Sequence, residues 1–360
     1  MQAMIKTILY RALGFSLLSF TTSLTAQTTD SPNPEKAEQS PWLFAPVATS
    51  DPKVGTSAGF VAGYLTHFDK QSPVSTFGNA STYSETDSWY SVFFANTYFG
   101  EDKHRLFGLY IDGKLRNDFD DFANAGIPLQ TSNTFDIYML RYQYQLWENW
   151  FIGGQAAASD IGVSGDNAYS SIVAQLVGLT DTKAVGMGLA ILYDTRDNQN
   201  SPATGTTFDI NNFAYRQSFG GESSFDSYTV KYHRYTTIFD KHVLAARLSG
   251  RFSNNAETGG LSSLDLRGYV GGEYLAEHMT VAEVDGRFQI NKTWGYSASA
   301  GMACLYNNTG DCGNYDNWYP SASVGLIYTI KPVDKIVLRA QYAVGKDNND
   351  GFYLNVGHPF

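Results

Sequence analysis

Apolar and polar residues alternate along most of this chain from Gly55 to the last residue, and turn-forming residues separate the alternating stretches. A two-residue period is that of a β-strand, because successive side chains point to opposite faces of a sheet. The pattern therefore predicts an all-β protein. The predicted strands cover residues 55–68, 75–84, 88–99, 104–117, 132–147, 150–160, 184–195, 205–218, 225–239, 242–253, 277–291, 294–306, 319–331, 335–345 and 351–360.

These predicted strands number 15, whereas an antiparallel barrel with both chain ends on one side needs an even number. We therefore predict 16 strands, with 14 as the alternative, and expect the missing strand between residues 55 and 99. Residues 168–180 are ambiguous because their apolar residues have helical spacing. They predict either a short helix within a loop or the missing strand.

Two predicted strands, 243–252 and 279–290, show the alternation most clearly. Each has charged or polar residues on one face and apolar residues on the other. In a transmembrane barrel the charges belong on the lumen side, because Arg or Lys facing lipid at the midplane costs about 2–4 kcal/mol. The predicted lumen charges are Arg247, Arg251, Glu283, Asp285 and Arg287. A soluble antiparallel sandwich would alternate in the same way.

The beginning of the chain has the features of an export signal. Lys6 and Arg11 precede a short apolar stretch, and small residues come before Gln27, which predicts a signal peptide over residues 1–26. The apolar stretch is too short to span a bilayer, and no run of about 20 apolar residues occurs elsewhere. We expect a flexible periplasmic leader over 27–54, no separate periplasmic domain, and a barrel over 55–360.

The end of the chain is an aromatic residue in a predicted strand. A barrel in lipid must pair every strand on both edges, because lipid offers no water to an unpaired backbone group. A terminal Phe is also what the assembly machinery of outer-membrane barrels recognises. The predicted assembly signal consists of Phe352, Leu354, Val356 and Phe360, which share one face.

Composition agrees with a transmembrane barrel and excludes one class of partner. Charged residues make up 17% of the chain and aromatic residues 15%, with 34 Gly and a mean hydropathy of -0.26. Such values are typical of strands with one face toward lipid and one toward a polar lumen. The formal net charge is -10, and no basic cluster occurs, so we expect outer-membrane lipid rather than nucleic acid as a partner.

Few residues suggest chemistry. Cys304 and Cys312 bracket a polar, turn-rich segment, and in an exported chain such a pair can form a disulfide that staples a loop. The six His residues are scattered, without zinc-ligand spacing, and no Gly-x-Ser-x-Gly motif occurs. We therefore expect no metal, no cofactor, no catalytic set and no enzymatic activity.

Three motifs together resemble one protein family. The first runs from Gly186 through Tyr193-Asp194-Thr195-Arg196-Asp197-Asn198 to Pro202 and Gly205, and the second is Leu266-Arg267-Gly268-Tyr269 followed by Gly271-Gly272. With the Phe-terminated last strand, they resemble the BamA/TamA-type outer-membrane proteins, or bacterial surface antigen family, without that family's periplasmic POTRA repeats. The resemblance covers residues 184–360, about half of the chain.

The resemblance implies a 16-stranded barrel whose motif-bearing loop folds into the lumen. It implies that Arg267 contacts an acid on the barrel wall, with Asp285 at the family's position and Glu283 as a second candidate. The second acid of some family members corresponds to Ser299, which favours an ion pair with one partner over a network. Asp194, Arg196, Asp197, Pro202 and Gly205 are expected to form a structural periplasmic turn.

Two functional classes follow from these expectations. The resemblance implies a role in outer-membrane protein assembly or translocation, with client outer-membrane proteins or a periplasmic partner, in the outer membrane of a Gram-negative bacterium. In this family the first and last strands are thought to join weakly, so that the barrel opens laterally. The alternative is a passive or gated outer-membrane pore, or a structural surface barrel.

Overall fold

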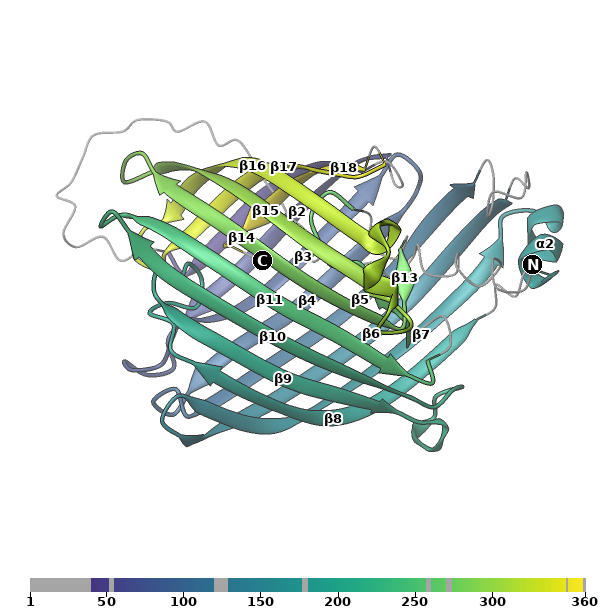
Figure 1. The fold of residues 1–360 in the computed structure, drawn as a ribbon, viewed down its shortest axis with the longest axis horizontal. Coiled ribbons are helices and arrows are strands. Elements are labelled where there is room, and N and C mark those ends of the chain that lie inside the picture. Colours follow the sequence, from purple (N-terminus) through teal and green to yellow (C-terminus); the bar gives the residue numbers. More distant parts are fainter. Residues whose placement is uncertain are drawn as a thin grey trace.

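The computed structural model describes residues 40–51, 55–119, 129–176, 181–256, 260–269, 274–347 and 349–358. Within these ranges 16 antiparallel strands form one sheet, which curls into a barrel (Figure 1). These strands are β1 (Trp42–Asp51), β2 (Gly55–Thr66), β3 (Ser75–Ser84), β4 (Trp89–Phe99), β5 (His104–Phe119), β6 (Leu129–Trp147), β7 (Trp150–Gly165), β8 (Thr182–Asp194), β9 (Gly205–Tyr215), β10 (Phe225–Ile238), β11 (His242–Asn254), β14 (His278–Gln289), β15 (Trp294–Tyr306), β16 (Trp318–Lys331), β17 (Ile336–Gly345) and β18 (Asp350–Val356).

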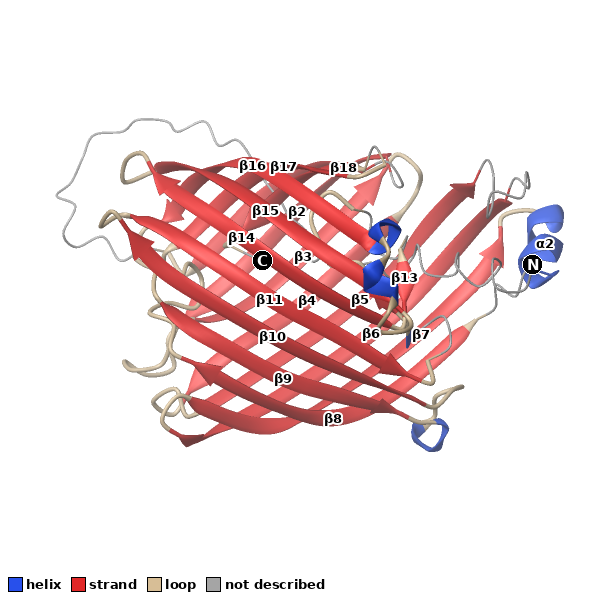
Figure 2. Cartoon of the chain, in the orientation of Figure 1, coloured by secondary structure: helices blue, strands red, loops and turns tan. Residues whose placement is uncertain are grey.

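Little else is regular (Figure 2). A two-stranded ribbon of β12 (Ser262–Ser263) and β13 (Leu275–Ala276) lies in the connection from β11 to β14. Among the described residues the helical elements are α2 (Ala168–Leu176) and the 3-10 turns η3 (Gln217–Phe219), η5 (Asp311–Gly313) and η6 (Tyr315–Asn317). In the described part of the chain, no helix has the length and apolar character needed to cross a membrane.

The predicted all-β barrel of 16 strands is confirmed, but the missing strand lies elsewhere than expected. It is β1, which pairs with β2 from Trp42 to Asp51. The expected flexible leader over 27–54 is therefore wrong for residues 42–51, while residues 1–39, including the predicted signal peptide, lie outside the described residues. Pro46 lies in β1, and an edge strand tolerates proline because one row of its backbone groups has no strand partner.

The ambiguous segment 168–180 is resolved by its helical spacing rather than by the strand count. Residues Ala168–Leu176 form α2, while 177–180 lie outside the described residues. Ser170 and Ala174, four residues apart, are the buried positions of α2. The helix lies at the end of the barrel where β7 leads into β8 (Figure 1).

The two ends of the barrel differ in their connections (Figure 1). At one end, which we call the short-turn end, the connections are short. The shortest has two residues (148–149) and the longest has ten (195–204). The opposite, long-loop end carries the 255–277 connection, the 307–317 segment and α2. Because the strands alternate in direction, the start of β1 and the end of β18 both lie at the short-turn end.

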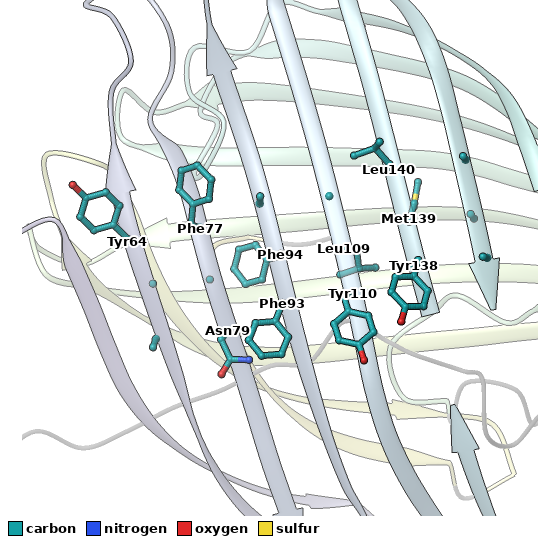
Figure 3. A pocket seen from close by; sticks show the side chains of 18 of the residues that line it. Tyr64, Phe77, Asn79, Phe93, Phe94, Leu109, Tyr110, Tyr138, Met139 and Leu140 are labelled. Carbon is teal, nitrogen blue, oxygen red and sulfur yellow. The ribbon is translucent and has the colours of Figure 1, made fainter. Parts of the chain in front are cut away.

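The outer face of the barrel is apolar and rich in aromatic residues. On β11, Leu244 and Leu248 are exposed on this face, whereas Arg247 between them is buried on the inner face. Phe93, Tyr110 and Tyr138 stack side by side on β4, β5 and β6 (Figure 3), with ring centroids 6.1 and 4.7 Å apart. They line a shallow apolar groove of about 860 Å³ across β1–β8.

The inner face is only partly polar. Inward-facing apolar side chains of β2–β7 form one buried cluster, which consists of Val61, Ala80, Val92, Ile111, Leu115, Phe135 and Ile161. A second cluster joins the β11–β14 connection to the inner wall of β14 and β15, and consists of Leu264, Leu266, Tyr269, Ala276, Met279, Val281, Ala303 and Leu305. Burial of this apolar surface stabilises the connection inside the barrel.

A charge placed on the outer face of β11 should weaken folding into a bilayer. We expect Leu248→Arg to lower the free energy of unfolding by about 2–4 kcal/mol, because the position faces lipid near the middle of the strand. Leu248→Ala is the control. It should lower the free energy of unfolding less than Leu248→Arg does, because alanine places no charge in the lipid. Urea titration of the folded chain in phospholipid vesicles measures both, and equal losses would contradict this orientation of β11.

Candidate functional site

The connection between β11 and β14 carries the first candidate site inside the barrel. Leu266 and Tyr269 are buried against the wall, which places the intervening Arg267 and Gly268 next to the inner faces of β14–β16. Gly268 has φ +90°, a conformation that strongly favours glycine. A Cβ at this position would also lie 2.8 Å from the backbone of Val344, so the motif's glycine permits close approach to β17. Gly271 and Gly272 lie outside the described residues.

Arg267 binds an acid on the barrel wall. Its Nη1 donates to Oε1 of Glu283 at 2.8 Å and lies 3.4 Å from Oγ of Ser299. The Glu283 side chain is almost fully buried, and Arg247 Nη2 lies 3.0 Å from its other oxygen, close enough for an ion pair although not aligned for a hydrogen bond. Arg247 also binds Asp265 of the same connection at 3.1 Å. Glu283 thus joins two arginines, one from the loop and one from the wall.

Asp285 belongs to a neighbouring set of charges. Its Oδ1 accepts from Nη2 of Arg339 at 2.5 Å, and its Oδ2 accepts from Nη1 of Arg339 and Nε of Arg287, each at 2.9 Å. Asp285 and Arg339 are both fully buried. This fork-to-fork pairing is the arrangement in which Arg and a carboxylate interact most strongly.

The expected pairing of Arg267 with Asp285 is therefore wrong, and the second candidate, Glu283, is the partner. The expectation of a single ion pair is also wrong, since Glu283 has two arginine partners. The alternation of the sequence places both acids on the inner face. It does not predict which position along β14 lies next to Arg267. Arg339 was missed; its inward position in the alternating segment of β17 was the available signal.

The tip of the loop is also bound to the last three strands. The backbone N–H of Gly268 donates to the hydroxyl of Tyr353 on β18 at 2.9 Å, and the Tyr269 hydroxyl donates to the carbonyl of Pro320 on β16 at 2.5 Å. The same hydroxyl accepts from the N–H of Lys346, between β17 and β18, at 2.8 Å. The loop therefore holds the long-loop end of β16–β18.

The second candidate site is the turn between β8 and β9 at the short-turn end. At its base, Asp194 accepts from Nη1 of Arg105 on β5 at 2.6 Å and from Nε and Nη2 of Arg196, each at 2.9 Å. The Asp194 side chain is almost fully buried. The Arg105 guanidinium also lies over the Phe151 ring, 3.7 Å from its centroid. The expected structural residues Asp194 and Arg196 are thus brought together, with Arg105 as a partner that the sequence pattern did not indicate.

The rest of this turn is held by its own polar side chains. Oδ1 of Asp197 accepts from the N–H groups of Ala203 and Thr204, at 2.8 and 3.0 Å. Gly205 has φ +110°, and a Cβ there would lie 2.3 Å from the carbonyl oxygen of Thr195, so the turn requires glycine at this position. Pro202 offers its carbonyl to Nη1 of Arg287 at 3.3 Å.

The last strand is shorter than predicted. The strand expected over 351–360 ends at Val356, because Gly357 has φ +87° and the chain leaves the strand there. Phe352, Leu354 and Val356 share the outer face, and Leu354 is buried, whereas the other two are exposed. Phe360 lies outside the described residues.

The two edges of the sheet, β1 and β18, meet at a seam. Their Cα atoms approach within 8 Å, but among the described residues no strand ladder joins them. At the short-turn end, Ile336 of β17 packs against Leu65 and Val74, with Leu43 of β1 beside them. Nζ of Lys331 also donates to the carbonyl of Ser40 at 2.6 Å. Side chains rather than backbone pairing thus hold this part of the seam.

The two cysteines lie at the long-loop end. Cys304 on β15 and Cys312 in η5 form a disulfide, and the indole N–H of Trp318 donates to the carbonyl of Cys312 at 2.8 Å. The bridge therefore staples the connection between β15 and β16. Among the described residues no group of three His, Cys, Asp or Glu side chains is arranged to hold a metal ion.

Removing the acid shared by two arginines should destabilise the barrel strongly. We expect Glu283→Gln to lower the free energy of unfolding by about 3–5 kcal/mol, because Arg247 and Arg267 then remain in a buried site without their common counter-charge. Asp265→Asn is the matched control, since the Asp265 side chain is half-exposed, and it should cost about 1 kcal/mol or less. Urea midpoints of the folded proteins measure both, and a similar loss in the two variants would contradict the central role of Glu283.

The ionised form of Asp197 should stabilise the short-turn end above its titration range. Burial raises the pKa of Asp197, but the N–H groups of Thr204 and Ala203 and the ammonium of Lys335 outweigh this and hold the pKa below its ordinary value. A lowered pKa gives stabilisation that is present above the unfolded value of about 4 and is lost as pH falls through the folded pKa. Asp197→Asn should therefore cost about 1 kcal/mol or less at pH 7, and the difference from the parent should shrink at pH 3. Urea unfolding at the two pH values tests this, and a difference that grows at pH 3 would contradict it.

Solved structures provide the comparison with known proteins, since no protein-family model and no curated protein sequence matches this chain. BamA from Haemophilus ducreyi lacking POTRA domains 1–3 is similar over 88% of this chain and 69% of its own, with 14% identity and a TM-score of 0.53. CdiB from Escherichia coli is similar over 89% of this chain and 63% of its own, with 13% identity and a TM-score of 0.63. CdiB from Acinetobacter baumannii is similar over 88% of this chain and 59% of its own, with 12% identity and a TM-score of 0.58.

The similarity extends over nearly the whole described barrel, whereas the chain spans only about 60% of the length of the two CdiB proteins. At such low identity the likeness concerns the arrangement of the strands. With its 16 strands and its loop bound to the inner wall, the chain has the fold of BamA-type and CdiB-type barrels.

Proposed function

We propose that this chain is an outer-membrane barrel that assists the assembly or translocation of other outer-membrane proteins. The observation that carries the proposal is the seam, where β1 and β18 approach each other without a strand ladder among the described residues. Separating them costs side-chain contacts rather than a row of backbone hydrogen bonds. An edge exposed in this way could pair with an incoming strand of a client barrel.

The location and orientation follow from the same fold. The apolar, aromatic outer face suits the hydrocarbon region of a bilayer. Barrels of the bacterial outer membrane have short turns on the periplasmic side and longer loops outside, so the short-turn end is assigned to the periplasm. The proposed partners are outer-membrane lipid, client outer-membrane proteins and a periplasmic protein that delivers them. This role requires no catalytic chemistry.

The inside of the barrel favours this role over a passive pore. A water-filled channel has a polar lumen, whereas here the inward-facing side chains of β2–β7 form a buried apolar cluster. The loop bearing Arg267 and Tyr269 occupies the inner wall of the other half. A pore or surface barrel remains the alternative function, with the lumen charges as the groups that would filter solutes.

A client-insertion assay tests the proposal. We expect liposomes that contain the folded chain to accelerate insertion of a small client barrel, because β1 and β18 provide edges for strand pairing. Liposomes with a heat-unfolded sample of the same chain are the control, and the fraction of protease-resistant client against time is the measurement. Equal rates in the two samples would refute the assembly role.

Conductance in planar bilayers tests the alternative. We expect small, intermittent currents from the parent and larger ones from Arg267→Ala, because the substitution removes the loop's bond to Glu283. Asp265→Asn changes a more exposed charge of the same loop and should alter conductance less. A large, steady conductance of the parent would favour the pore.

A further inference from the structure

The turn of residues 195–204, between β8 and β9, contacts parts of the barrel that are far apart in the sheet. Its carbonyl groups at Pro202 and Ala203 accept from Arg287 on β14 and Thr237 on β10, at 3.3 and 3.2 Å. β10 neighbours β9, whereas β14 is separated from β9 by two strands, β10 and β11. The turn therefore bends inward across the short-turn end instead of following the rim.

The same turn reaches the connection between β16 and β17, residues 332–335. Nδ2 of Asn200 donates to the carbonyl of Asp334 at 3.0 Å, and Oδ2 of Asp197 binds Nζ of Lys335 at 3.0 Å. The turn also lies beside the end of β18, because a Cβ built on Gly357 would be 3.4 Å from the carbonyl oxygen of Asn200. The turn thus connects the middle of the sheet to the strands next to the seam.

The base of the turn is held by ion pairs of the buried Asp194. Asp194 is buried and bound by Arg105 and Arg196, so the turn is fixed to β5 and β8. Its shape is maintained by Asp197 and by Asn198, whose Oδ1 accepts from the N–H groups of Asn200 and Ser201 at 2.9 and 2.8 Å. The contacts with residues 334 and 335 are more exposed than the base, since half of the Lys335 side chain is accessible. The weaker contacts are therefore those with residues 334 and 335.

We propose that the 195–204 turn is a latch that holds β16–β18 against β1 at the short-turn end, and that release of its contacts with Asp334 and Lys335 permits the seam to open. The loop bearing Arg267 holds the opposite end of the same strands through Tyr353 and Pro320. The latch is thus a second restraint, on the side that faces a periplasmic partner. The latch proposal goes beyond the proposed function, because opening of the seam can be measured in the absence of a client protein.

A cysteine at the seam reports opening directly. Leu65 on the inner face of β2 is buried against Ile336 of β17 at the short-turn end, so Leu65→Cys becomes accessible to water when β16–β18 move away there. The native cysteines are joined in a disulfide, which leaves the new thiol as the reactive one. The labelling rate of this thiol by N-ethylmaleimide, in the full chain folded in phospholipid vesicles, is the measurement.

Weakening the latch should speed labelling. We expect Asp197→Asn and Lys335→Met each to raise the labelling rate about two- to fivefold, the range expected when a partly exposed ion pair is lost. Asn at position 197 retains the oxygen that accepts from Ala203 and Thr204, so the shape of the turn is preserved. Glu101→Gln removes an ion pair with Lys103 within one turn of the same end and is the matched control. Unchanged rates in both latch variants, or an equal rise in the control, would overturn the proposal.

Locking the latch should have the opposite effect. Asn200→Cys combined with Asp334→Cys places two thiols at an existing contact, and their oxidation to a disulfide should slow amide hydrogen exchange in β17 and β18, with recovery after dithiothreitol. The parent under the same reagents controls for the Cys304–Cys312 bridge. Exchange that is as fast in the cross-linked protein as in the parent would overturn the latch. A failed client-insertion assay would instead refute the assembly role and leave the latch in place.

Discussion

The structure depends on one constraint, the pairing of backbone groups between neighbouring strands. Fifteen consecutive strand pairs satisfy it around the sheet, and the two remaining edges, on β1 and β18, face each other without a ladder among the described residues. In hydrocarbon an unpaired backbone group costs several kcal/mol, so the seam is the weakest line of the barrel. Side chains compensate there through the apolar contact of Ile336 with Leu65 and the bond from Lys331 to Ser40.

The charges inside the barrel follow from the same geometry. Inward positions cannot be solvated like surface positions, and Arg247 of β11, Arg287 of β14 and Arg339 of β17 are therefore paired with acids of β14. Removing one member of such a set is costly, because the remaining charge stays buried. The loop arginine, Arg267, joins this set through Glu283, so the position of the loop depends on the wall's charge balance.

The period of the sequence predicted the strands well because alternation is a local property. It placed Leu248 outside and Arg247 inside, and it predicted the inward face of Glu283 and Asp285. It failed at β1, which contains a proline and follows a polar segment, and whose strand state depends on pairing with β2. It also failed to choose between Glu283 and Asp285, because that choice depends on Arg339, 54 residues further along the chain. The contacts of residues 195–204 with the β16–β17 connection depend in the same way on the curvature of the sheet.

The two restraints on β16–β18 act at opposite ends of these strands. One is the bond of Tyr353 to the loop tip, and the other is the contact of residues 334 and 335 with Asn200 and Asp197. If only one restraint is released, the strands pivot about the other, and the gap widens as a wedge from one membrane surface. A full-height gap would need both releases, so signals from the two sides of the membrane would combine in one mechanical response.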